Sequence, residues 1–166
     1  MILAIDPGLH ACGCAIFDAN TSNELLWAGL VKNPIDVHPE NPSYPSGLWN
    51  SMVDAVDTEL HVLGYEPDRL AIELPQVYIA SRSKGDPNDL IALAGLVGAF
   101  THWFRGMTFL YLPREWKGSV PKKIMNDRVL KHLSEEERVK IEKSPKSLQH
   151  NVYDGVGIGL RHLKRL

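Results

Sequence analysis

Two apolar stretches that each end in a carboxylate constrain the fold of this chain more than any other feature. The first, Ile2-Leu3-Ala4-Ile5, ends at Asp6 and is followed by Pro7-Gly8; the second, Leu70-Ala71-Ile72, ends at Glu73. Short apolar runs bounded by turn residues are typical of buried strands. A carboxylate at the end of such a strand is costly to desolvate unless something pairs with it. The pattern therefore predicts two buried strands with functional acidic ends, although an Asx-type turn at Asp6 and an ordinary salt bridge at Glu73 are the simpler alternatives.

The order of the predicted elements indicates an α/β fold. Strands are predicted at 1–6, 11–18, 24–31, 69–74 and 108–112, and the first three form an antiparallel meander. Helices are predicted at about 47–63, 87–103, 122–132, 135–142 and from Ser144-Pro145 to about 163. Because helices and strands alternate after the meander, we expect a five-stranded mixed sheet flanked by helices on both faces, in one domain spanning 1–166. Strands 1–6 and 69–74 would be parallel neighbours, with Asp6 and Glu73 at their carboxyl ends.

The predicted C-terminal helix carries a third group of polar side chains. His150 and Asp154 are four residues apart and share a helix face, and Asn151 lies on nearly the same face. The helix also contains Gly155, Gly157 and Gly159, each of which costs roughly 1 kcal/mol relative to alanine in a helix interior. We expect close packing of this helix on the sheet to compensate, and to bring Asp154 against Asp6. A histidine that only bonds backbone in the first helical turn is the alternative for His150.

Charge is distributed unevenly along the 166 residues, whose net charge is −2. Residues 1–80 carry two basic and eleven acidic side chains, and residues 81–166 carry sixteen basic and nine acidic ones. Such asymmetry points to a polyanionic partner, although solvated helix faces would produce it too. Two clusters place aromatic residues among cations, the pattern that suits a phosphate backbone and an unstacked base. Their members are Tyr78, Arg82 and Lys84, and then Arg114, Trp116, Lys117, Lys122 and Lys123. A position in the core is the equal alternative for Trp116.

Several other classes of function fit the sequence poorly. No apolar run approaches the ~20 residues of a membrane span, and no signal peptide is evident, so we expect a cytoplasmic protein. Cys12 and Cys14 are interpreted as small buried hydrophobes, because no second pair completes a zinc site. No Gly-x-x-x-x-Gly-Lys loop is present, so we expect no nucleotide cofactor. The small residues Ala92, Gly95 and Ala99 predict close helix packing within the chain, with a dimer seam as the weaker possibility.

Taken together, these motifs resemble the RuvC family of Holliday-junction resolvases, within the ribonuclease H-like superfamily. Residues 2–9 look like the family's opening motif, Ala71-Ile72-Glu73 like its second carboxylate strand, and 150–162 like its catalytic helix. The likeness spans most of the chain. The compact size and the Trp116-Lys117-Gly118 segment look more like the bacteriophage branch.

The resemblance implies a homodimer that binds four-way DNA junctions and nicks two strands symmetrically, with two Mg²⁺ or Mn²⁺ ions in each active site. Asp6, Glu73 and Asp154 match the family's metal-binding carboxylates. The remaining family ligand is an Asp or His three residues before the last Asp; here that position is Asn151, with His150 one place earlier. Either residue is a candidate for the fourth ligand. His150 is also a candidate to orient water or carry a proton during hydrolysis that leaves 5′-phosphate ends.

Two further readings stay open at this point. A nuclease of the same fold acting on flaps, forks or RNA/DNA hybrids would carry the same carboxylates, because the fold does not fix the substrate. A non-catalytic junction-binding protein would explain the unusual register of His150 and Asn151.

Overall fold

The computed structural model of the chain describes residues 1–36, 39–41, 43–77, 87–118, 120–141, 145 and 147–166. Its centre is a five-stranded sheet in the order β3-β2-β1-β4-β5. The strands are β1 (Ile2–Asp6), β2 (Ala11–Phe17), β3 (Leu25–Lys32), β4 (Arg69–Glu73) and β5 (Met107–Tyr111). The first three form the predicted antiparallel meander, and β1-β4 and β4-β5 are parallel pairs. The expected mixed sheet is therefore confirmed.

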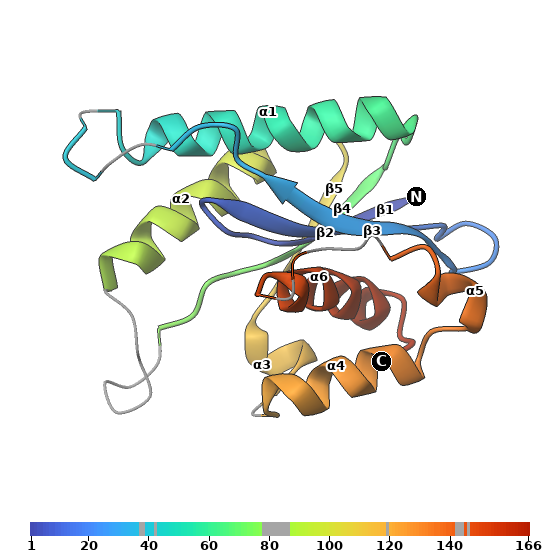
Figure 1. Cartoon of the computed structure of the whole chain (residues 1–166). Coiled ribbons are helices and arrows are strands. Elements are labelled where there is room, and N and C mark those ends of the chain that lie inside the picture. The colour runs from blue at the N-terminus through green and yellow to red at the C-terminus, as the bar shows by residue number, and fades with distance from the viewer. Residues whose placement is uncertain (37–38, 42, 78–86, 119, 142–144, 146) are drawn as a thin grey trace.

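Helices cover both faces of this sheet (Figure 1). They are α1 (Ser46–Leu63), α2 (Pro87–Trp103), α3 (Pro113–Trp116), α4 (Lys122–Lys131), α5 (Glu135–Arg138) and α6 (Gln149–His162). One face packs against α1 and α2, which pair through residues such as Met52 and Leu96. The other face packs against α6, and α4 lies against the outer side of α6. None of the helices in the described ranges has the length and apolar character needed to cross a membrane.

Strand alternation decides which way the two acidic strand ends face. Successive side chains of a strand point to opposite faces of the sheet. Ile2 and Ala4 of β1 belong to the core under α6, and so does Ala71 of β4. Leu3, Ile5, Leu70 and Ile72 belong to the core under α1 and α2. By the same alternation, Asp6 and Glu73 lie on the α6 face, where the helix carrying Asp154 packs.

Two predicted helix boundaries were wrong. The helix expected at 135–142 ends at Arg138, because the chain then turns to pair with the edge strand β3: Ala28 forms an isolated bridge with Ile141 and donates its N–H to Lys140 O at 3.4 Å. The last helix begins at Gln149 and not at 144–145; the N–H groups of Leu148 and Gln149 both bond Pro145 O, which makes a separate turn. Ser134 and Glu137 form a capping box at the start of α5.

The small residues of α2 serve packing within the chain, as predicted. Ala92 is buried, and its carbonyl accepts the indole N–H of Trp49 in α1 at 2.7 Å. A Cβ at Gly95 would lie 2.1 Å from the Trp49 ring. The stripe therefore lets α1 approach α2 within the chain.

Candidate active site

Glu73 and Asp154 converge on one cation, the ammonium of Lys117. The Lys117 Nζ lies 3.1 Å from Glu73 Oε2 and 3.2 Å from Asp154 Oδ2. The two carboxylate side chains are only 14% and 12% exposed, and Lys117 is 25% exposed. The three residues come from the end of β4, the middle of α6 and the turn after α3. A carboxylate pair largely removed from water is thus held around a single positive charge.

Glycine contacts bring α6 close enough to place Asp154 there. Gly13 of β2 stands opposite Asp6 in the β1-β2 register. A Cβ at Gly13 would lie 1.8 Å from Asn151 O, and one at Gly155 would lie 2.6 Å from Gly13 O. Backbone therefore packs on backbone where the helix crosses the strand. The sequence expectation that the glycine-containing helix approaches the sheet is confirmed, and Asp154 lies within one residue of the contact.

Asp6 completes the acidic cluster at this edge of the sheet. It ends β1 one residue after Ile5, which is in register with Ile72 of the parallel strand β4, so Asp6 and Glu73 are neighbouring strand ends. Its charge acts on Lys117, where it adds to the fields of Glu73 and Asp154. The structure thus brings together the three carboxylates that the sequence singled out.

Trp116 fixes Glu73 through a hydrogen bond. Its ring is 4% exposed, and its indole N–H donates to Glu73 Oε2 at 2.6 Å. The Lys117 Nζ lies 4.6 Å from the centre of the same ring, in cation–π contact. The ring packs in the core beneath Gly157 of α6, and contact of Trp116 with DNA stays a prediction.

Lys117 was expected to contact DNA, and its pairing with the carboxylates was missed. The signal for this pairing was present in the order of elements. Because β5 is the parallel neighbour of β4, the segment that follows β5 must pass over the same sheet edge as Glu73. A Trp-Lys pair in that segment is placed to supply a hydrogen bond and a positive charge to a buried carboxylate.

The electrostatics of the cluster show an excess of negative charge. Burial raises the pKa of Glu73, and the nearby Lys117 and the Trp116 N–H lower it by less, so the net direction is upward. For Lys117, burial lowers the pKa, but Glu73, Asp154 and Asp6 together raise it more. Among the described residues, the ammonium of Lys117 is the cation that lies against both Glu73 and Asp154.

The donor chemistry fits hard divalent cations, since Mg²⁺ and Mn²⁺ prefer carboxylate oxygens. Nevertheless, in the described part of the chain no three His, Cys, Asp or Glu side chains stand at metal-binding spacing. Lys117 lies between Glu73 and Asp154 instead. The residues fit divalent ions in kind and charge, and the arrangement would have to open at Lys117 to admit them.

The remaining predicted residues are placed as follows. His150 and Asn151 lie in the first turn of α6, both half-buried, and Asn151 contacts Gly13 through its backbone carbonyl. Whether either ligates a metal stays a prediction. Arg114 and Lys123 are exposed on α3 and α4, which suits contact with a polyanion. Lys122 begins α4, but its side chain lies outside the described residues, as do Tyr78, Arg82 and Lys84.

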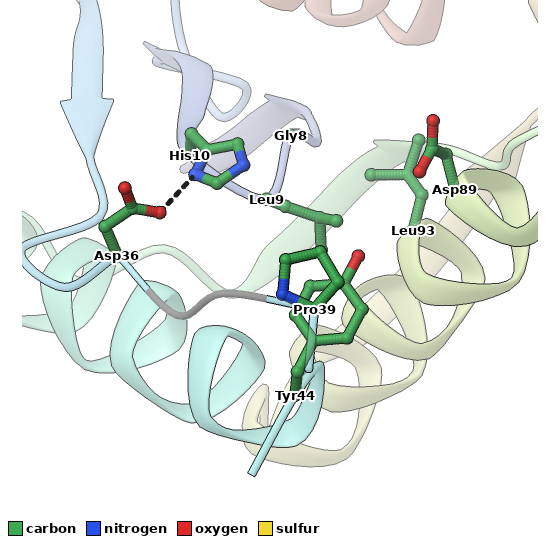
Figure 2. A pocket seen from close by; sticks show the side chains of 8 residues that line it. All are labelled: Gly8, Leu9, His10, Asp36, Pro39, Tyr44, Asp89 and Leu93. Carbon is green, nitrogen blue, oxygen red and sulfur yellow. Dashed lines mark ion pairs between the residues drawn. The ribbon is translucent and has the colours of Figure 1, made fainter. Parts of the chain in front are cut away.

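A cavity of about 710 Å³ has a lining that does not include the three carboxylates (Figure 2). It begins at Gly8, two residues after Asp6, and His10 and Asp36 form an exposed ion pair of 3.8 Å at its rim. Its lining residues are Gly8, Leu9, His10, Asp36, Pro39, Tyr44, Asp89 and Leu93. Among the described residues, this lining has two carboxylates, Asp36 and Asp89, and no Lys or Arg. The three carboxylates at the strand ends and on α6 are therefore the candidate site.

Comparisons by sequence and by structure gave different results. No protein-family model matches the chain, and no curated protein matches it. Among solved structures, it is similar to Thermus thermophilus RuvC in complex with a Holliday junction substrate (20% identity, TM-score 0.62, covering 97% of this chain and 90% of that one). It is also similar to the yeast mitochondrial Holliday junction resolvase (12% identity, TM-score 0.60, covering 99% and 79%). With the strand order and the helices on both faces, these likenesses show that the chain has the ribonuclease H-like fold of the RuvC resolvases.

Proposed function

We propose that this protein is a metal-dependent endonuclease that resolves four-way DNA junctions and related branched DNA. The observation that carries the proposal is the convergence of Glu73 and Asp154 on one ammonium, with Asp6 beside them at the same sheet edge. The fold neighbours, a RuvC solved with a Holliday junction and a mitochondrial Holliday junction resolvase, support the choice of substrate.

Asp6, Glu73 and Asp154 would hold two Mg²⁺ or Mn²⁺ ions, with His150 or Asn151 as a further ligand. The ions would supply a water of lowered pKa and stabilise charge on the leaving 3′ oxygen, which gives 5′-phosphate ends. The chain's own contribution is orientation. Trp116 fixes Glu73 through its N–H, and the Gly13–Gly155 packing fixes Asp154 relative to Asp6.

The layer of helices on the α6 face is the proposed surface for the DNA backbone. Residues 113–166 carry thirteen basic and seven acidic side chains, and Arg114, Lys123 and Arg128 are exposed on α3 and α4. Phosphate contacts of this kind release counterions, so affinity should fall steeply as salt rises.

Two subunits are proposed, because two symmetric nicks require two active sites. The exposed face of α2 is the surface we assign to the contact. Ile91, 71% exposed, shares that face with exposed Ala94 and Gly98, three and seven residues further on.

The test is cleavage of labelled four-way junctions, three-way forks, flaps, linear duplex and RNA/DNA hybrid, with Mg²⁺ or Mn²⁺ and with EDTA. Paired symmetric nicks in the four-way junction that disappear with EDTA are the expected result. Cleavage of every branched form would make the protein a general debranching nuclease, and hybrid-only cleavage a ribonuclease H. Tight junction binding without cleavage would make it a binding protein.

Asp6→Asn is expected to lower the cleavage rate by about 10²–10³-fold while junction affinity changes little. The substitution removes one negative charge from the metal-binding edge but leaves the basic surface intact. Rates come from single-turnover assays and affinity from gel shifts. Asp57→Asn, on the exposed side of α1, is the matched control and should behave as wild type. Normal cleavage by Asp6→Asn with Mg²⁺ would show that the carboxylate site is not catalytic.

A further inference from the structure

The position of Lys117 raises a question that the proposed metal chemistry does not answer. Its ammonium lies where Glu73 and Asp154 converge, at 3.1 and 3.2 Å, which is the place a cation shared by both carboxylates would take. Asp6 acts on the same ammonium. The strongest attraction for an incoming metal ion is thus directed at a point already held by a side chain.

The contacts of Glu73 show why a metal ion and Lys117 would compete for the same carboxylate oxygen. A carboxylate oxygen has two lone pairs. Glu73 Oε2 accepts the indole N–H of Trp116 at 2.6 Å and contacts the Lys117 ammonium at 3.1 Å. A metal ion that binds this oxygen must replace one of the two. The indole is buried and fixed, whereas Lys117 has a flexible stem and is 25% exposed, so Lys117 is the group that can leave.

The ammonium can remain in contact with Trp116 after it leaves the carboxylates. The centre of the Trp116 ring lies 4.6 Å from the Lys117 Nζ. A cation can remain over an indole face while its carboxylate contacts are lost. Release therefore needs a change of side-chain rotamers only, with no rearrangement of the sheet or of α6.

We propose that Lys117 is a resident cation that competes with divalent metal for Glu73 and Asp154. It neutralises part of the buried charge when metal is absent, and it must be displaced when metal binds. Lys117 is thus a positioning residue that sets the metal concentration at which the site loads. The inference rests on the proposed metal-dependent function and adds to it a side chain that competes with the metal ion.

The test is Mn²⁺ binding to the DNA-free protein, measured by titration calorimetry and by the electron paramagnetic resonance signal of free Mn²⁺. Lys117→Met keeps the length of the stem and removes the charge. It is expected to bind Mn²⁺ about tenfold more tightly than wild type, equivalent to about 1.4 kcal/mol. Lys131→Met, at an exposed position of α4, is the matched control and should bind as wild type does.

The fluorescence of Trp116 gives a second readout that does not depend on activity. Mn²⁺ should quench wild-type emission at the concentrations at which it binds, and Lys117→Met should shift this quenching to lower Mn²⁺. Trp116→Phe identifies the part of the signal that belongs to this ring. If Lys117→Met does not fold, as judged by circular dichroism, Lys117→Gln is the replacement, with the same expected direction.

The outcomes separate the two proposals. Equal or weaker Mn²⁺ binding by folded Lys117→Met, with wild type binding measurably, would overturn the competition while leaving the metal site intact. Absence of Mn²⁺ binding in wild type and in every variant would overturn the metal-dependent function itself. Tighter binding by Lys117→Met and not by Lys131→Met supports both.

Discussion

Glu137 shows how a buried charge is stabilised in this protein. It is 2% exposed and accepts N–H groups from Leu25 and Ser134, each at 2.8 Å, and from the guanidinium of Arg165 at 2.7 and 2.8 Å. Burial alone would raise the pKa of Glu137, but these donors lower it from 4.5 to about 2. One carboxylate thereby joins β3, α5 and the C-terminal segment.

Glu137→Gln is expected to lower the free energy of unfolding by about 3 kcal/mol at pH 7. The folded-state pKa is depressed, so the stabilisation is fully present above the unfolded pKa of 4.5 and is lost as pH falls through about 2. The difference between wild type and variant, measured by urea unfolding, should therefore shrink over that range. Glu135→Gln is the control, because the Glu135–Arg138 pair is exposed and worth only about 0.5 kcal/mol. Equal losses in the two variants would contradict this account.

The cysteine thiols are expected to be inert in the native protein. Both are fully buried, and burial raises the pKa of Cys12 to about 12 and raises that of Cys14 as well. A thiolate is the reactive form, so a disulfide reagent at pH 8 should modify neither residue until the protein unfolds. Counting the thiols that react with and without denaturant checks this. Rapid native labelling would mean that the β1-β2 end of the sheet opens.

At the scale of elements, the crossing of α6 over β2 decides the geometry of the site. Gly13 and Gly155 let the helix backbone rest on the strand, and this contact fixes how far Asp154 stands from Asp6. The same closeness leaves no room for a side chain.

Gly13→Ala is expected to destabilise the fold by about 3 kcal/mol and to reduce cleavage strongly. Its Cβ would lie 1.8 Å from Asn151 O, so the start of α6 must move away and carry Asp154 with it. Unfolding curves and cleavage rates measure the two effects. Gly64→Ala is the control: Gly64 has φ of 71° but nothing within 4 Å, so it should lose only about 1 kcal/mol and keep its activity. Similar activity in both variants would separate α6 packing from catalysis.

At the scale of the whole molecule, the basic C-terminal part of the sequence lies in one layer of helices. The described residues of 113–166, a segment rich in Lys and Arg, form the α3–α6 layer on one face of the sheet, and α1 and α2 cover the other (Figure 1). The carboxylate cluster lies between the sheet and this basic layer. A polyanion bound to the layer would lie next to the carboxylate cluster.

Ile91→Glu is expected to convert the proposed dimer into a monomer and to replace paired nicks by single nicks. A charge at a 71% exposed apolar position of α2 would be buried in the contact without a partner. Light scattering after size exclusion measures the mass. Val62→Glu is the control, because Val62 is 77% exposed on α1, outside the assigned contact. A dimer that survives Ile91→Glu would place the interface elsewhere.

Local pattern in the sequence determined most of the fold. Alternating and apolar runs predicted all five strands, and in the structure β1 and β4 end at Asp6 and Glu73. Helical spacing predicted α1, and the predicted bounds of α2 and α4 are also right to within a few residues. The glycines of the last helix predicted its approach to the sheet. Each of these signals lies within a short stretch of chain, where residue periodicity and turn chemistry act directly.

Only the tertiary structure decided what neutralises the buried carboxylates. The contacts of Trp116 with Glu73 and of Lys117 with Asp154 span 43 and 37 residues. The sequence showed an aromatic residue beside cations, which fits either a DNA surface or a buried ion pair. In the structure Lys117 forms the buried ion pair, because an acidic strand end that is removed from water needs a donor and a positive charge close by. The end of α5 at Arg138 was decided in the same way, by pairing with the distant strand β3.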